Sequence, residues 1–142
     1  MKLHKIEIAK RQLDVAIDIL RADGDYLAII TLAGAAEEIL GALVKRQNKL
    51  AVVDHLIELD CKLSGGREFD VVNHEINGIR NALKHANHSN EDEIEVEHSD
   101  AVAILSRAVA NYILLGEVES PKVLWFYNYL NTYCEEIGRN TM

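Results

Sequence analysis

Residues 67–87 read REFDVVNHEINGIRNALKHAN and carry the most regular hydrophobic pattern in the chain. The apolar residues recur at steps of three and four, which is the spacing of one face of an α-helix. The pattern therefore predicts an amphipathic helix whose apolar face packs against a core. The residues of that face are Phe69, Val72, Ile76, Ile79, Leu83 and Ala86.

The other side of this predicted helix is polar. Because the core does not need these side chains, we expect them to lie on a face that is left for another molecule. Arg80 and Lys84 lie on one flank of this face. Its remaining members are His74, Asn77, Asn81, His85 and His88.

Five further segments have helical patterns, at about 3–22, 26–47, 49–63, 99–115 and 121–137. We predict that Gly24 ends the first helix and that Asp25 caps the second, and that Ser99 or Asp100 caps the fifth. Ser120 and Pro121 have the residue types expected at the start of the last helix. Its aromatic residues predict either a closing helix of the bundle or a dimer surface.

Length and composition agree with a single domain. The chain has 142 residues, of which 49% are hydrophobic, and it contains one proline. This is enough apolar material for one core, and the residue usage favours helices over strands. We therefore predict an all-α fold, a single-domain up-and-down bundle of five to six helices over residues 1–142.

The acidity of the chain is local. The formal net charge is −8, but residues 91–100 contain six acidic residues, so the rest of the chain carries about −2. The net charge therefore does not exclude a nucleic-acid partner, although phosphate contacts require Lys and Arg. This acidic run predicts a loop that is a cation site, a partner-docking loop or a solvated connection.

We predict a cytoplasmic protein. Cys61 and Cys134 lack a CxxC companion, so we expect reduced, core or partly buried thiols. The first residues are not followed by an uninterrupted apolar run, so no secretory signal is expected. Residues 26–44 are apolar, but Glu37 and Glu38 interrupt them, which argues against a membrane span.

The second predicted helix has two features that bear on a site. Glu37 and Glu38 lie among apolar residues, and we expect at least one of them to be buried and to need a partner. Beside them runs a stripe of small residues, which would allow another helix to approach closely. The stripe contains Gly34, Ala35, Gly41 and Ala42, with Glu38 set into it.

Arg80, Asn81 and His85 are candidates for phosphodiester chemistry. A guanidinium can hold a phosphate and stabilise developing negative charge, and an imidazole can transfer a proton near neutral pH. The amide of Asn81 can orient the histidine or the substrate. The alternative is a solvated helix face on which these residue types occur by chance.

A metal site is a weaker hypothesis, and we expect neither a metal nor a cofactor. His85 and His88 are three residues apart on one helix face, and His74, His98 or Glu91 could complete a set of ligands. No recognised ligand spacing supports such a set.

The run Arg80-Asn81-Ala82-Leu83-Lys84-His85 resembles the Arg-x-x-x-x-His motif of the HEPN superfamily (higher eukaryotes and prokaryotes nucleotide-binding). The family often has a polar residue after the arginine, as Asn81 is here. Residues 33–43 are similar to the alanines, acidic residue and leucines of the family's second helix. The resemblance covers about residues 26–88.

This resemblance implies an all-α bundle, often a homodimer with the two motifs facing each other. Active members are metal-independent endoribonucleases that leave 2′,3′-cyclic phosphate ends. Arg80 would then stabilise the phosphate and His85 would transfer a proton, while Asn81 assists and Glu37 or Glu38 positions the arginine. Our candidates for substrate contacts are Lys84, His88 and Asn77.

Two functions remain open at this point. The chain is either an RNA-cleaving or RNA-binding component of a toxin–antitoxin or phage-defence system, with any antitoxin a separate protein, or a non-catalytic module that binds a nucleotide, a small ligand or a protein. A ribonuclease needs a cationic path to the motif. The candidates for that path are Lys45, Arg46, Lys49 and Arg67.

Overall fold

The computed structural model describes residues 1–56, 77–84, 93–117 and 120–141, with the side chains of residues 137 and 139–141 left out. Its long helices are α1 (Lys5–Arg21), α2 (Tyr26–Arg46), α5 (His98–Leu114) and α6 (Pro121–Thr141). Residues 52–56 and 77–82 form two short helical segments, and the described residues contain no strand. The all-α prediction is confirmed. Residues 57–63 of the predicted helix at 49–63 lie outside the described residues, as do residues 67–76 and 85–87 of the predicted helix at 67–87.

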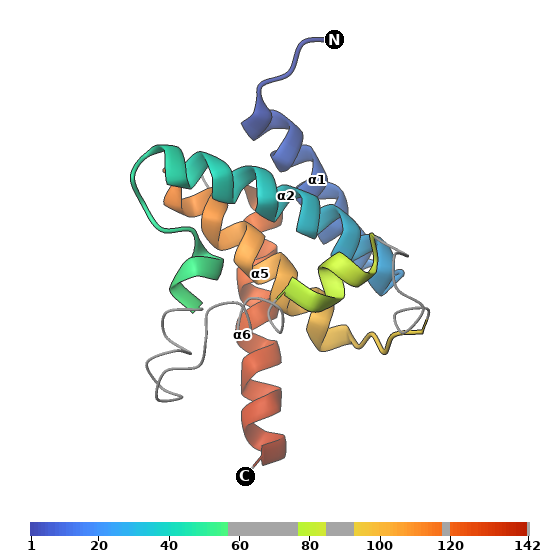
Figure 1. Ribbon diagram of the computed structural model, residues 1–142. Coiled ribbons are helices and arrows are strands. Elements are labelled where there is room, and N and C mark those ends of the chain that lie inside the picture. The colour runs from blue at the N-terminus through green and yellow to red at the C-terminus, as the bar shows by residue number, and fades with distance from the viewer. Residues whose placement is uncertain (57–76, 85–92, 118–119, 142) are drawn as a thin grey trace, which may run out of the picture.

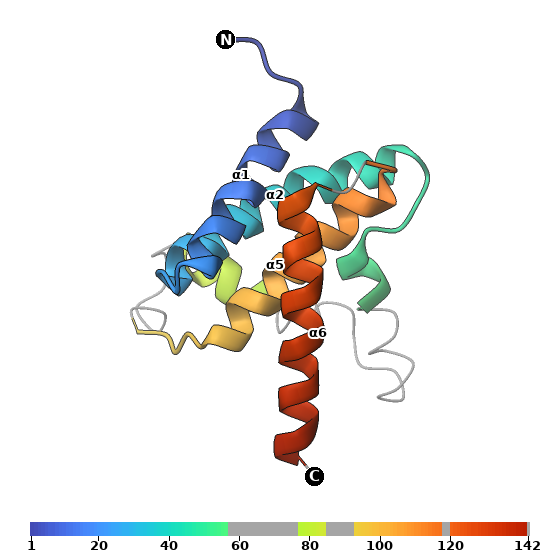
Figure 2. The same ribbon diagram turned by 180° about the vertical axis from the view of Figure 1, so that it is seen from behind.

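Helix α2 lies between α1 and α5 and packs against both, as Figures 1 and 2 show. Its apolar side chains are fully buried where they meet the neighbouring helices. α2 is also the one described helix long and apolar enough to cross a membrane, but half of its apolar window is buried inside the fold. The α2 residues in the core are Ile29, Ile30, Ala33, Ala36 and Leu40.

The turn between α1 and α2 follows local hydrogen-bonding rules, with one correction to the prediction. Gly24 was predicted to end the first helix, but Asp23 takes the left-handed position at the end of α1, with a φ of 52°. Gly24 follows it. The Asp23 N–H donates to the Leu20 carbonyl and the Gly24 N–H to the Ile19 carbonyl, which is a Schellman motif. A Cβ on Gly24 would lie 2.6 Å from Ile19 Cγ2, so glycine is needed there for space.

The predicted caps of α2 and α6 are confirmed, and that of α5 is shifted. Asp25 Oδ1 accepts from the Leu27 N–H at 2.8 Å, and Ser120 Oγ accepts from the Val123 N–H at 3.2 Å. Helix α5 is capped by Glu97 rather than by Ser99 or Asp100. Asp100 acts from the third helical position, where its carboxylate accepts from the Glu97 N–H at 2.8 Å.

The first half of α6 closes the bundle. Val123 and Phe126 are buried, and Trp125 and Tyr129 are partly buried against the same core. The helix continues past the predicted end to Thr141, and its last turns project beyond the other helices (Figure 1). Cys134, on this part, is a free and exposed thiol rather than a partly buried one. Cys61 lies outside the described residues.

The helical segment at 77–82 departs from the prediction in two ways. It ends at Ala82, because the Lys84 N–H bonds to the Asn81 carbonyl in a tighter turn, whereas the prediction continued the helix through residues 83 and 84. It also does not leave its whole polar side free. Asn77 is 5% exposed and Arg80 turns toward α2, whereas Asn81 is exposed as predicted.

Candidate functional site

A buried carboxylate on α2 organises the polar part of the fold. Glu37 is 2% exposed, and its two oxygens accept from Arg107 Nε at 3.0 Å and from Arg107 Nη2 at 3.1 Å. Arg80 Nη1 lies 3.8 Å from Glu37 Oε1. The expectation that one of the acidic pair is buried with a partner is confirmed for Glu37. We refer to Glu37, Arg80 and Arg107 as the buried triad.

The charges of the buried triad do not balance. One carboxylate faces two guanidinium groups, whose side chains are 15% exposed in Arg80 and 10% exposed in Arg107. The bidentate pair with Arg107 has the fork geometry that makes such bonds strong. The triad therefore keeps one net positive charge in a mostly buried place, where an anion would be stabilised.

Gly34 creates the path by which Arg80 reaches Glu37. A Cβ at Gly34 would lie 2.9 Å from both Cγ and Cδ of Arg80, which is closer than real contacts allow. At this position the small-residue stripe makes room for a side chain, and close approach of another helix stays a prediction. The stem of Arg80 crosses α2 directly over this glycine. Arg80 Nε is buried and has no hydrogen-bond partner among the described residues.

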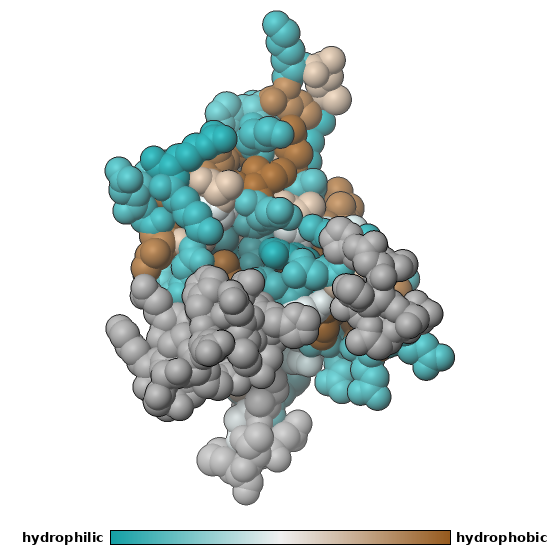
Figure 3. Space-filling model, in the orientation of Figure 1, coloured by the Kyte–Doolittle hydropathy of each residue, from teal (hydrophilic) through white to brown (hydrophobic). Residues whose placement is uncertain are grey.

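Beside the triad lies a cavity of about 350 Å³, which we call the polar cavity. It is bounded by α2, residues 51–54, residues 77–80 and α5. Figure 3 shows hydrophilic side chains gathered over the centre of this face of the molecule. Its lining includes Glu37, Glu38, Gly41, Ala42, Lys45, Ala51, Val53, Asp54, Asn77, Arg80 and Asn111.

Of the three candidate cations that the structure describes, one lies at the polar cavity. Lys45 lines it and is paired with Asp54 at 3.3 Å. Arg46 lines a different cavity, and Lys49 Nζ donates to the Leu114 carbonyl at 3.3 Å. Arg67 lies outside the described residues.

The structure brings together some of the predicted site residues. Glu37, Arg80 and Asn77 share the polar cavity. Glu38, with a 66% exposed side chain, pairs at its edge with Lys84, whose Nζ lies 3.2 Å from Glu38 Oε2. Asn81 lies on the exposed side of its segment, away from this group. His85 and His88 lie outside the described residues.

Two site residues were missed in the sequence, although α5 carries a signal for both. Arg107 is the only charged residue between Asp100 and Glu117, and Asn111 follows it by four positions, on the same helix face. A lone cation in an apolar helix needs a buried partner, which here is Glu37. Asn111 is fully buried, and its Oδ1 accepts from the Val52 N–H at 2.9 Å.

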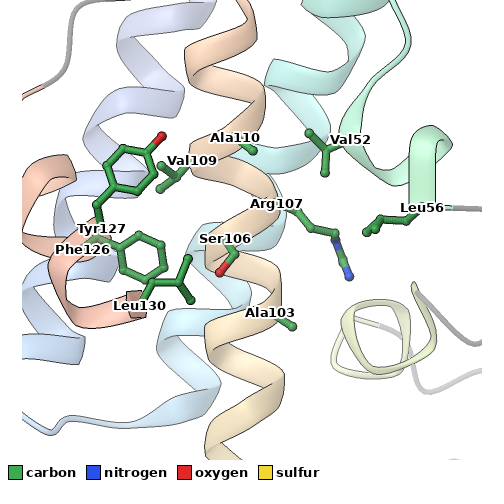
Figure 4. Close-up of a pocket in the computed structure, with 10 residues that line it drawn as sticks. All are labelled: Val52, Leu56, Ala103, Ser106, Arg107, Val109, Ala110, Phe126, Tyr127 and Leu130. Atoms are coloured by element: carbon green, nitrogen blue, oxygen red, sulfur yellow. The ribbon is translucent and has the colours of Figure 1, made fainter. Parts of the chain in front are cut away.

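A second cavity, of about 430 Å³, lies over the outer face of α5 and is almost entirely apolar. Figure 4 shows Phe126 and Leu130 of α6 on one side of α5 and Val52 and Leu56 on the other. Among the described residues of its lining, Arg107 is the one charged side chain. The guanidinium of Arg107 thus connects this apolar cavity to the buried triad.

His98, one of the histidines considered above as a metal ligand, has other contacts. His98 packs against the rings of Tyr26 and Tyr133 and forms a hydrogen bond with the hydroxyl of Tyr129. Within the described ranges, no three His, Cys, Asp or Glu side chains are placed to hold a metal ion. His74, His85, His88 and Glu91 lie outside those ranges.

Comparisons with models of protein families, with curated proteins and with solved structures found no match to this chain.

Proposed function

We propose that this chain is a HEPN-like helical bundle that binds an RNA phosphodiester at Arg80 and cleaves it without a metal ion. The observation that carries the proposal is the buried triad. Glu37 holds Arg80 at the polar cavity, in the positioning role that the resemblance implies for an acidic residue of this helix. An arginine held in this way needs little reorganisation to meet a phosphate.

The proposed reaction is an internal transfer. The 2′-hydroxyl oxygen attacks the adjacent phosphorus, the bond from phosphorus to the 5′-oxygen breaks, and a 2′,3′-cyclic phosphate and a 5′-hydroxyl result. Arg80 stabilises the negative charge on the phosphoryl oxygens. His85 transfers a proton, a role taken from the sequence motif. Lys84, His88 and Asn77 remain proposed substrate contacts, and Asn81 a proposed auxiliary residue.

The test is incubation of the purified protein with RNA in EDTA, beside the Arg80→Ala/His85→Ala variant. We expect cyclic phosphate ends from the unchanged protein and none from the variant. Lys122→Ala is the matched control, because Lys122 is an exposed cation paired with Asp18 of α1 and has no contact with the polar cavity. Equal cleavage by the protein and the double variant, or by neither, would refute the catalytic proposal.

A non-catalytic binding module is the second candidate, and the charges around the polar cavity favour it. Glu38 and Asp54 place negative charge at the same cavity as Lys45 and Arg80. A long polyanion is repelled by such carboxylates, whereas a single small anion can avoid them. Under this proposal the chain binds mononucleotides in the polar cavity but leaves RNA intact.

We also propose that the protein is a cytoplasmic homodimer of a toxin or defence system, with a separate antitoxin. Asn81, on the exposed side of the 77–82 segment, is a surface residue that a second copy could contact. Light scattering at micromolar concentration tests the dimer. A monomer under these conditions would exclude a site composed from two motifs.

A further inference from the structure

Asn111 lines the polar cavity and carries an unused hydrogen-bond donor. Its Oδ1 accepts from the Val52 N–H, and this bond determines which side of the amide carries oxygen. Nδ2 therefore lies on the other side, where it is buried and has no partner among the described residues. A buried donor without an acceptor destabilises the protein, so this atom calls for an acceptor from a ligand or from water.

The surroundings of this donor suit a flat ring. Gly41, Ala42, Ala51 and Val53 line the same cavity and are small or apolar. A Cβ on Gly41 would lie 3.6 Å from Asn111 Nδ2, so the glycine keeps a side chain away from the amide on the α2 side. At about 350 Å³, the cavity is within the range of small-molecule sites.

The polar cavity contains a second unused donor of a different kind. Arg80 Nε is also buried and has no partner within the described part of the chain, and the guanidinium to which it belongs carries positive charge. One cavity therefore has a cationic donor, suited to a phosphate oxygen, and a neutral donor between small apolar residues. A nucleotide has a matching pair of groups, a phosphate and a base with a carbonyl oxygen or ring nitrogen that accepts.

We infer that Asn111 recognises the base of the nucleotide whose phosphate Arg80 binds. The base lies between the small residues of α2 and residues 51–53, and Nδ2 donates to its acceptor. This inference depends on the proposed function for the phosphate, but it assigns a separate residue on a separate helix to the base.

Substituting Asn111 itself would leave the Val52 N–H without its acceptor and would risk unfolding the protein. Gly41→Ala avoids this problem. Its new methyl group would meet Ala51 Cβ at 3.5 Å and Asn111 Nδ2 at 3.6 Å, which are ordinary contacts. Because alanine also favours a helix more than glycine does, this variant is expected to be at least as stable while it covers the donor. The matched control is Gly138→Ala on α6, where a Cβ meets nothing within 4 Å.

The experiment is calorimetric titration with uridine 3′-monophosphate, ribose 5-phosphate and inorganic phosphate. We expect the unchanged protein and Gly138→Ala to bind the nucleotide about tenfold more tightly than ribose 5-phosphate, which is the size of effect of one buried hydrogen bond with some ring burial. Gly41→Ala should lose this tenfold difference and keep its affinity for inorganic phosphate. Arg80→Ala should weaken the binding of all three probes.

The outcomes separate the two proposals. If the nucleotide and ribose 5-phosphate bind equally, or if Gly41→Ala keeps the difference, the base site is refuted and the phosphate site stands. If Arg80→Ala binds all probes as the unchanged protein does, the phosphate site is refuted, and loss of the difference in Gly41→Ala would still support Asn111. No binding of any probe would refute both.

Discussion

Glu37→Gln tests whether the buried triad holds the fold together as its geometry indicates. Glutamine keeps the shape of the side chain but removes the charge, and its amide group places a donor against one of the two Arg107 donors. Two guanidinium groups then remain mostly buried with no counter-charge from the triad itself. Removing one partner of a buried ion pair costs about 3 to 5 kcal/mol, so we expect a loss of about 4 kcal/mol in the free energy of unfolding.

Urea unfolding followed by tryptophan fluorescence measures this loss, because Trp125 is packed against the core. With a slope of about 2 kcal/mol per molar urea, the unfolding midpoint should fall by about 2 M. Glu38→Gln is the matched control on the neighbouring position. It removes an exposed carboxylate paired with Lys84, and we expect a change of less than about 1 kcal/mol.

A double-mutant cycle with Arg107→Met identifies the source of the loss. If the cost comes from an unpaired buried charge, Arg107→Met should restore part of the stability of Glu37→Gln, since it removes one stranded cation. A loss of less than about 1 kcal/mol in Glu37→Gln, or strict additivity of the two substitutions, would show that the triad does not stabilise the protein as argued.

Four further outcomes are expected. Gly34→Ala should displace Arg80 and reduce the proposed RNA cleavage by roughly a hundredfold with unchanged circular dichroism, since a shift of about 1 Å can cost that much. Gly116→Ala should cost about 1 kcal/mol in urea unfolding, because Gly116 has a φ of 79°. Phe126→Ala, at a fully buried position, should cost about 3 to 5 kcal/mol in the same assay. Burial raises the pKa of Tyr129 above the ordinary value of 10.0, so the folded state holds the phenol proton more tightly than the unfolded state does. The stability that this group contributes should be fully present below pH 10.0 and should be lost as the pH rises through the raised pKa. Above pH 10.0 the free energy of unfolding should therefore fall less in Tyr129→Phe.

Much of the local structure could be predicted because its causes lie within a few residues. The period of the apolar residues determines where α1, α2 and α6 run, and Asp25 and Ser120 cap their helices through bonds to N–H groups two or three positions away. The errors among these predictions of helix positions and caps are small. The cap of α5 moved from Ser99 or Asp100 to Glu97, because both Glu97 and Asp100 can bond to the same exposed turn.

The site could be predicted only in part. The resemblance selected Arg80 and the acidic pair, but the projection of 67–87 placed Arg80 and Asn77 on a free face. That projection ranks side chains by hydrophobicity and cannot account for a buried carboxylate that draws an arginine inward.

By itself, the sequence of this protein determined an all-α chain, the approximate course of its long helices and the stripe of small residues on α2. Only the tertiary structure decided that Glu37 rather than Glu38 is buried, because neighbouring positions on a helix differ by about 100° in direction and α5 packs on one of them. It also decided the partner of Glu37. Arg107 lies 70 residues away in the chain, and no local rule connects two charges at that separation until the helices pack and remove both from water.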